Sequence, residues 1–173
     1  MNLIISDTDI KIDNNIMISE NIKYFDLNKF NIKSCLGCYS CWVRTPSVCI
    51  IKDDAQLIYP NVAHSENLIY VTKIAYGTYD TTLKIFLERC LPTQQPFIRE
   101  YNGETHHVQR DVKMKNAIII AYGAKNDKEK EIFKKLVNRN AHNMMFETVD
   151  VIFTEFENIS RNVNEECMKW KNC

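Results

Sequence analysis

A cluster of four cysteines is the feature of this sequence that could carry chemistry most directly. Within Ser34–Cys49, Cys35, Cys38, Cys41 and Cys49 follow the spacing C-x2-C-x2-C-x7-C. Thiolates are the ligands that iron–sulfur clusters require, and three at this spacing can wrap a [4Fe–4S] cube that the fourth closes. Zinc suits the pattern less, because its usual sites pair two separated groups of ligands.

The alternative interpretation of these cysteines needs no metal. Free cysteines commonly pack as small hydrophobic side chains. We favour four neighbouring free thiols that hold at most a labile cluster, then a stable [4Fe–4S] cluster, then zinc. We expect the other three cysteines to lie in the core (Cys90 and Cys167) and in the tail (Cys173).

Composition restricts the classes of function. The chain has 173 residues, 45% hydrophobic and 25% charged, with a net charge of +0 and a pI near 6.9. Such a balance gives no positive field for a nucleic-acid backbone. No stretch reaches the roughly 20 apolar residues of a membrane span, and no signal peptide is recognisable. Seven cysteines without a secretion signal indicate a cytoplasmic protein whose thiols are reduced.

Short apolar runs alternate with helical patterns along the whole chain, which predicts a single α/β domain over residues 1–173. Continuous runs of this kind suit strands that are buried on both faces of a parallel sheet. The expected strands are Asn2–Ser6, Ile22–Leu27, Leu68–Thr72, Ala117–Tyr122 and Val149–Thr154. We expect a doubly wound five-stranded sheet in the flavodoxin-like order 2-1-3-4-5, which binds ligands beyond the carboxyl ends of its strands.

The expected helices differ in length. Asp53 or Asp54 can cap a helix that buries Leu57, Ile58 and Val62, with Pro60 kinking or restarting it. The further helical patterns are Thr81–Leu91, Asp127–His142 and a stripe from Ile159 to Trp170. Only about fourteen residues separate the first two strands, so the helix of the first crossover must be very short or missing. Alternatively, Ile10 and Ile12 could belong to a hairpin arm that folds back.

Three segments carry a resemblance to a known family. These are CLGCYSCWVRTPSVCIIKDD, AYGTYDTTLKIFLERCLPTQQPF and GETHHVQRD, between Asn31 and about Tyr122. In this order they resemble the flavodoxin-like NAD(P)H-dependent FMN reductases and the related iron–sulfur flavoproteins. The resemblance implies bound FMN, NAD(P)H as reductant, a small-molecule or protein electron acceptor, and a homodimer or homotetramer.

The resemblance also implies which residues meet the flavin. Its phosphate would face the loop after the first strand, and its ring the loops after the third and fourth. The candidate residues are Ser6, Thr8, Thr72, Lys73, Ala75, Tyr76, Gly77, Thr78, Tyr122, Gly123 and Ala124. We expect Lys73, the new cation at the switch point, to contact the phosphate or to cover the ring.

The first loop departs from the family pattern. Family members carry a Gly-Ser-Pro-Arg type loop whose backbone N–H groups cradle the phosphate. Here the stretch reads SDTDIKIDNN, without glycine or arginine and with three aspartates that would repel a phosphate. Two functions therefore stay open: an FMN-dependent NAD(P)H oxidoreductase, or a flavin-free binding, assembly or cysteine-loop electron-transfer protein.

Other polar motifs have structural interpretations. His106 and His107 are neighbours and would chelate one ion only on a loop, because neighbours on a strand point to opposite faces. A polar surface turn is the interpretation we favour for them. Asp53 and Asp54 resemble a helix cap more than a catalytic dyad. The charged run Lys125–Lys135 is typical of a solvated helix face.

Overall fold

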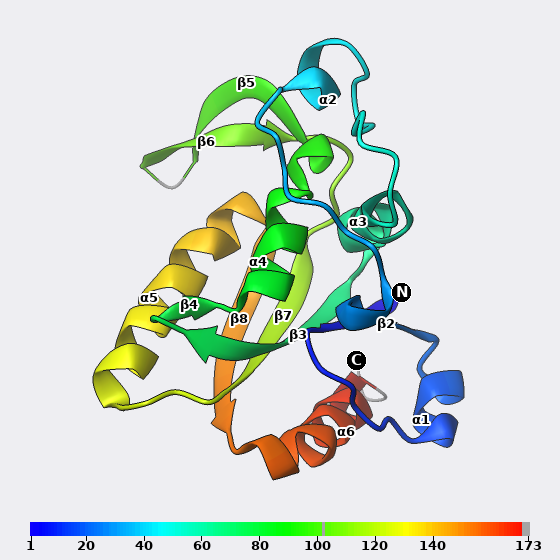
Figure 1. Cartoon of the computed structure of the whole chain (residues 1–173), viewed down its shortest axis with the longest axis vertical. Helices are drawn as coiled ribbons and strands as arrows, with labels where there is room; N and C mark the ends of the chain where they lie inside the picture. Colours follow the sequence, from blue (N-terminus) through cyan, green and yellow to red (C-terminus); the bar gives the residue numbers. More distant parts are fainter. Residues whose placement is uncertain (102, 171–173) are drawn as a thin grey trace.

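A parallel sheet forms the centre of the molecule (Figure 1). The computed structural model describes residues 1–101 and 103–170, so Cys173 lies outside the described residues. The sheet has the order β2-β1-β3-β7-β8, and the short β4 pairs antiparallel with the end of β3. These strands are β1 (Asn2–Ser6), β2 (Ile22–Asp26), β3 (Asn67–Ala75), β4 (Thr78–Tyr79), β7 (Lys115–Tyr122) and β8 (Phe146–Thr154). The expected fold class and strand order are confirmed.

Helices cover both faces of the sheet. Because side chains alternate along a strand, Leu3 and Ile5 face one core while Ile4 faces the other. The first core is closed by α3 (Ala55–His64), α4 (Thr81–Glu88) and α5 (Asp127–Asn143). The second core is closed by α1 (Asn14–Ser19) and α6 (Ile159–Lys169). Short 3-10 turns, η1 (Leu27–Lys29), η2 (Leu91–Thr93) and η3 (Phe156–Asn158), join these elements.

The first crossover is short, as expected. It holds one helix, α1, of six residues. Ile10 and Ile12 do not form a hairpin arm. Ile10 is buried in the second core and Ile12 packs against it, which fixes this segment over α6.

Some helical expectations were wrong in detail. Leu57 is exposed, whereas Ile58 and Val62 are buried as expected. Pro60 sits inside α3 without ending it. The helix expected over Thr81–Leu91 ends at Glu88, and η2 follows it.

The cysteine segment and a hairpin form a separate region at the top of Figure 1. The hairpin consists of β5 (Gln94–Tyr101) and β6 (Glu104–Gln109). Beside it lies α2 (Ser40–Val43), whose Trp42 donates a hydrogen bond from Nε1 to the Leu91 carbonyl. Among the described residues, no helix has the length and apolar character needed to cross a bilayer.

Candidate functional site

The carboxyl ends of β1, β3 and β7 bring the predicted site residues to one edge of the sheet. The register pairs Ser6 with Val71, and Lys73 with Tyr122. Gly123 and Ala124 follow β7 directly, and Thr8 follows β1. The predicted residues therefore border one region of the fold, the switch point at which doubly wound sheets bind ligands.

A buried carboxylate, Asp7, lies at the end of this region that follows β1, where the flavin phosphate was expected; we call it the phosphate end. Asp7 is 9% exposed, and its Oδ2 accepts hydrogen bonds from Thr72 Oγ1 (2.7 Å) and the Lys73 backbone N–H (2.9 Å). Tyr122 donates its hydroxyl to Asp7 Oδ1 at 3.3 Å. Burial raises the pKa of Asp7 to about 6, although these hydrogen bonds act in the opposite direction. Asp7 is therefore largely ionised at neutral pH.

The donors that the sequence offered to a phosphate bond within the chain instead. The Ser6 hydroxyl donates to the Thr8 carbonyl at 2.7 Å and accepts from the Thr8 N–H at 3.1 Å. The backbone N–H of Asn15, at the start of α1, donates to Asp13 Oδ1. The residues at this end do not fit the phosphate of FMN, because a carboxylate lies there and the Ser6 hydroxyl and the Thr8 and Asn15 N–H groups already make hydrogen bonds.

The ring end is shaped by a tight hairpin. We expected a loop over Thr72–Thr78, but β3 continues to Ala75 and pairs with β4 across the two-residue turn Tyr76–Gly77. Both turn residues have positive φ, 54° and 75°, as the type I′ turn of a two-residue hairpin requires. Tyr76 is 90% exposed, and Lys125 Nζ lies 5.3 Å from the centroid of its ring beside the sheet edge.

Glu129 fixes this turn from α5. Its Oε1 accepts the Gly77 N–H at 3.1 Å, and its Oε2 accepts the Lys125 N–H at 2.7 Å. These hydrogen bonds, led by the one from Lys125, hold the pKa of Glu129 below its ordinary value. We expected the charged run around it to be a solvated face, and for Glu129 this was wrong. Asn126, whose Oδ1 accepts the Glu129 N–H, forms with it a capping-box pattern that could have revealed the role.

Lys73 lies against the loop that follows β7. A Cβ placed on Gly123 would meet Lys73 Cγ at 3.4 Å and Cε at 3.6 Å, and Gly123 itself has φ +74°. The aliphatic stem of Lys73 therefore covers Gly123. On the other side of this loop, Gly123, Ala124 and Phe153 help to line a cavity of about 320 Å³.

The cysteine loop lies apart from the switch point, next to the β5–β6 hairpin. Cys38 is exposed, Cys41 is buried, and Cys35 and Cys49 are half-buried; all four are free thiols. Hydrogen bonds from Ser40 lower the pKa of Cys38. Burial, and then the neighbouring charges of Cys49, Cys35 and Cys38, raise the pKa of Cys41. Thiolates would suit iron or zinc, but in the described part of the chain no three of these sulfurs lie within 4.8 Å of one another, so the predicted ligands do not form a ready-made metal site.

A buried ion pair closes this loop at its base. Arg89 donates to both carboxylate oxygens of Asp53, at 2.6 and 2.9 Å, and to the Lys33 carbonyl at 2.6 Å. It also approaches Cys49 Sγ at 3.4 Å. Asp53 in turn accepts the N–H groups of Lys33 and Ala55. Asp54 is the N-cap residue of α3 but makes no side-chain cap hydrogen bond, whereas Asp53 accepts the N–H of Ala55, the first residue of the helix. The Arg89–Asp53 pair joins both ends of the cysteine segment to the end of α4.

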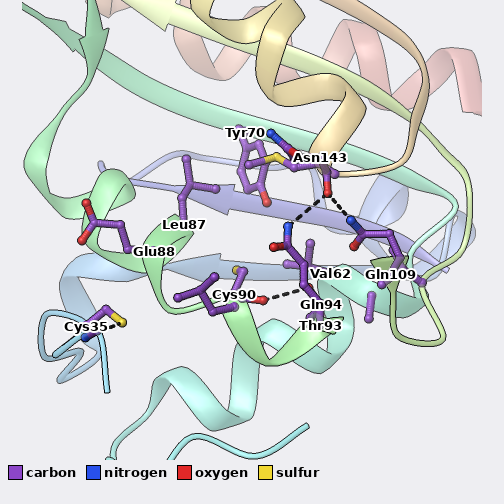
Figure 2. A pocket seen from close by; sticks show the side chains of 15 residues that line it. Cys35, Val62, Tyr70, Leu87, Glu88, Cys90, Thr93, Gln94, Gln109 and Asn143 are labelled. Carbon is purple, nitrogen blue, oxygen red and sulfur yellow. Dashed lines mark hydrogen bonds between the residues drawn. The ribbon is translucent and has the colours of Figure 1, made fainter. Parts of the chain in front are cut away.

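An apolar cavity of about 380 Å³ opens beneath the cysteine loop, at the end of the sheet where the chain enters β3, β7 and β8 (Figure 2). Cys35, Leu87 and Cys90 contribute to its walls. The hydroxyl of Tyr70 is buried at this cavity and has no hydrogen-bond partner among the described residues. This cavity could not be predicted from the sequence, because Tyr70 lies in a continuous apolar strand.

Comparison with known proteins agrees with this architecture. No protein-family model matches the chain. An iron–sulfur flavoprotein of Methanocaldococcus jannaschii is 30% identical over 69 residues, which are 40% of this chain. The match covers 34% of that relative, so the chain spans about a third of its length.

Solved structures match nearly the whole chain. An FMN-dependent NADH-azoreductase from Bacillus anthracis, in complex with FMN, has a TM-score of 0.58 and 11% identity, covering 98% of this chain and 97% of the other. An NAD(P)H:quinone oxidoreductase from Methanothermobacter marburgensis has a TM-score of 0.58 and 10% identity, covering 99% and 92%. These similarities establish the flavodoxin-like fold.

Proposed function

We propose that this chain is an electron-transfer oxidoreductase that uses NAD(P)H and a flavin, and that it holds the flavin by its ring rather than by its phosphate. The observation that carries the proposal is that the flexible Lys73 stem, and no backbone of the described residues, lies over the Cβ position of Gly123 at the switch point. A planar ligand can enter there by displacing one flexible side chain. The fold, and the FMN-dependent reductases that share it, support the same location.

Each group at this edge has a defined part in the proposal. A bound flavin accepts hydride from a nicotinamide and passes the electrons to a small-molecule or protein acceptor. Tyr76 offers an aromatic face for stacking. Lys73 covers the ligand from the β3 side, and Gly123 permits close backbone approach from the β7 side. Asp7 opposes a phosphate, so FMN is an exchangeable ligand in this proposal.

An activity assay with a matched glycine control tests this function. Oxidation of NADH or NADPH with a quinone acceptor should depend on added FMN. Gly123→Val should raise the half-saturating FMN concentration about tenfold, because the added side chain fills the space between Gly123 and Lys73 that the ring would occupy. Gly103→Val is the control, since Gly103 has a similar φ of +76° and its Cβ position has no other described atom within 4 Å beyond its chain neighbours. Flavin-independent oxidation, or equal effects of the two substitutions, would contradict the proposal.

A second candidate is a flavin-free protein that acts through its cysteine loop. The observation that favours it is the buried Asp7 carboxylate at the phosphate end. Anaerobic reconstitution with iron and sulfide tests it directly. Four iron atoms per chain, lost in Cys35→Ala, would support a [4Fe–4S] carrier. The six free thiols of the described residues suit a reducing compartment, and we propose the cytoplasm for either function.

A further inference from the structure

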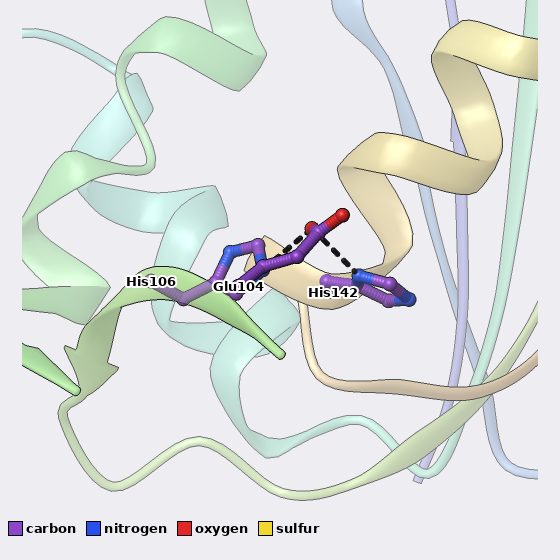
Figure 3. A group of neighbouring side chains, drawn as sticks. All are labelled: Glu104, His106 and His142. Carbon is purple, nitrogen blue, oxygen red and sulfur yellow. Dashed lines mark hydrogen bonds and ion pairs between the residues drawn. The ribbon is translucent and has the colours of Figure 1, made fainter. Parts of the chain in front are cut away.

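Three potential metal ligands meet where the β5–β6 hairpin touches the end of α5, away from the proposed flavin region (Figure 3). Glu104 and His106 lie on β6, and His142 lies in the last turn of α5. One ligand atom from each residue lies within 4.8 Å of the other two. The polar surface turn expected for His106 and His107 was wrong, because both lie on strand β6. The neighbour that could share an ion with His106 is His142, 36 positions along the chain.

The spacing of these atoms suits one small ion. His106 Nε2 lies 3.1 Å from Glu104 Oε2, and His142 Nδ1 lies 3.5 Å from the same oxygen. Zinc binds nitrogen and oxygen ligands at about 2.0–2.2 Å in a tetrahedron, which places two ligands about 3.3 Å apart. The two measured separations lie on either side of this value, so an ion could enter with small side-chain adjustments.

The surrounding groups orient the ligands in the way that metal sites require. Arg139 pairs with Oε1 of Glu104, which leaves Oε2 directed at the imidazoles. Asn143 Oδ1 lies 3.0 Å from His106 Nδ1, so it can accept that N–H and leave the lone pair on Nε2. Carboxylate and amide partners of this kind commonly fix the ring orientation and tautomer of metal-binding histidines.

One ligand atom has no other use in the described structure. Among the described residues, buried His142 Nδ1 has Glu104 Oε2 as its near polar neighbour, at 3.5 Å, which is too long for a good hydrogen bond. Buried polar atoms nearly always have a partner. A cation held between His142, His106 and Glu104 would satisfy this nitrogen and the shared oxygen together.

We propose that Glu104, His106 and His142 form a binding site for a first-row divalent cation of the zinc type. Two imidazoles and a carboxylate are borderline ligands that suit such ions better than calcium or magnesium. The side chains of His142 and Glu104 are 35% and 30% exposed, so a fourth position faces solvent and takes water. The ion joins the β5–β6 hairpin to α5 and thereby fixes a wall of the apolar cavity through Asn143.

Cobalt(II) titration of the purified full chain tests the site. The expected result is one Co²⁺ per chain with the visible absorption of a tetrahedral ion and with no thiolate charge-transfer band for that ion. His142→Ala and Glu104→Gln should each weaken binding at least tenfold. Circular dichroism of both variants confirms that they are folded. Zn²⁺ should raise the melting temperature of the wild type but not that of His142→Ala or Glu104→Gln.

Two control variants separate this site from other metal-binding groups. Cys38→Ser removes the exposed thiol of the cysteine loop, and His64→Ala removes an exposed histidine of α3. Both should leave the tetrahedral ion in place. Binding that survives in His142→Ala, that disappears in Cys38→Ser, or that is absent from folded wild type at 1 mM Co²⁺ would overturn the proposal. The assay contains no flavin, so its result does not depend on the proposed function.

Discussion

At the scale of single residues, Asp7 determines whether the switch point can accept a phosphate. The sequence identified it only as one of three aspartates that would repel a phosphate. Its burial could not be predicted, because it depends on Thr72, Lys73 and Tyr122, which lie far away in the chain. A charged group that remains ionised in such a place costs folding free energy.

Asp7→Asn should stabilise the protein in a pH-dependent way. The pKa of Asp7 is about 6 in the folded chain and 3.8 ordinarily, so its protonated form is favoured by folding. The stability it confers is complete below about pH 4 and is lost as pH rises through 6. Asn keeps an acceptor for Thr72 and Lys73 and carries no charge. At pH 7.5 we expect a free energy of unfolding about 1–3 kcal/mol above wild type.

Denaturant titrations of both proteins at pH 4.5 and pH 7.5 measure this effect. The difference between them should shrink at the lower pH, where Asp7 of the wild type is largely protonated. A gain in stability that is equal at both pH values would show that Asp7 is not the titrating group.

At the scale of elements, the strands were predictable and the interactions between segments were not. Continuous apolar runs such as Leu68–Thr72 identified each parallel strand. The extension of β3 to Ala75 was missed because Lys73 interrupts the apolar run and its pairing with Tyr122 is a tertiary feature. The role of Asp53 was likewise only partly visible, since it was expected to cap a helix and not to hold a buried arginine.

Arg89→Met should destabilise the chain severely. The side chains of Arg89 and Asp53 are 0% and 1% exposed, so the substitution leaves a buried carboxylate without its partner. Breaking such a pair costs about 3–5 kcal/mol. Arg161→Met is the control, because the Arg161–Glu165 pair is exposed and contributes at most about 1 kcal/mol. Thermal or chemical denaturation compares the two, and similar small losses would show that the buried pair is not essential.

At the scale of the whole molecule, the hairpin region suggests self-association. Phe97 and Ile98, which are neighbours on β5, are 67% and 65% exposed. The nearby cysteine segment also exposes Leu36 and Val43. Soluble monomers rarely leave such apolar groups together on their surface. We therefore expect a homodimer or homotetramer formed through this region.

Light scattering with size-exclusion chromatography tests the assembly. The wild type should have a mass that is a multiple of 20.3 kDa at micromolar concentration. The double substitution Phe97→Glu and Ile98→Glu should give the monomer. Ile18→Glu, at a residue of α1 that is 81% exposed, should leave the assembly unchanged. A wild type that runs only as the monomer would contradict this expectation.

The topology of the whole molecule could be read from the sequence, because strand order follows from the alternation of strands and helices. The hydrogen bonds of the proposed flavin region could not be predicted from the sequence, because they depend on where a few polar side chains point. Ser6 and Thr8 lie near the switch point, but the Ser6 hydroxyl donates to the Thr8 carbonyl and accepts the Thr8 N–H. The metal ligands were missed in part because His142 joins His106 only through the packing of α5 on β6.

The most direct test of the account is to compare the binding of FMN and riboflavin, which differ by the phosphate alone. Flavin fluorescence quenching by the wild type at pH 7.5 should give dissociation constants within about threefold of each other, since the phosphate has no cradle. FMN that binds tenfold or more tightly than riboflavin, about 1.4 kcal/mol, would show that the phosphate is recognised. No quenching by either flavin at about 100 µM, a binding free energy weaker than roughly −5.5 kcal/mol, would exclude the flavin function.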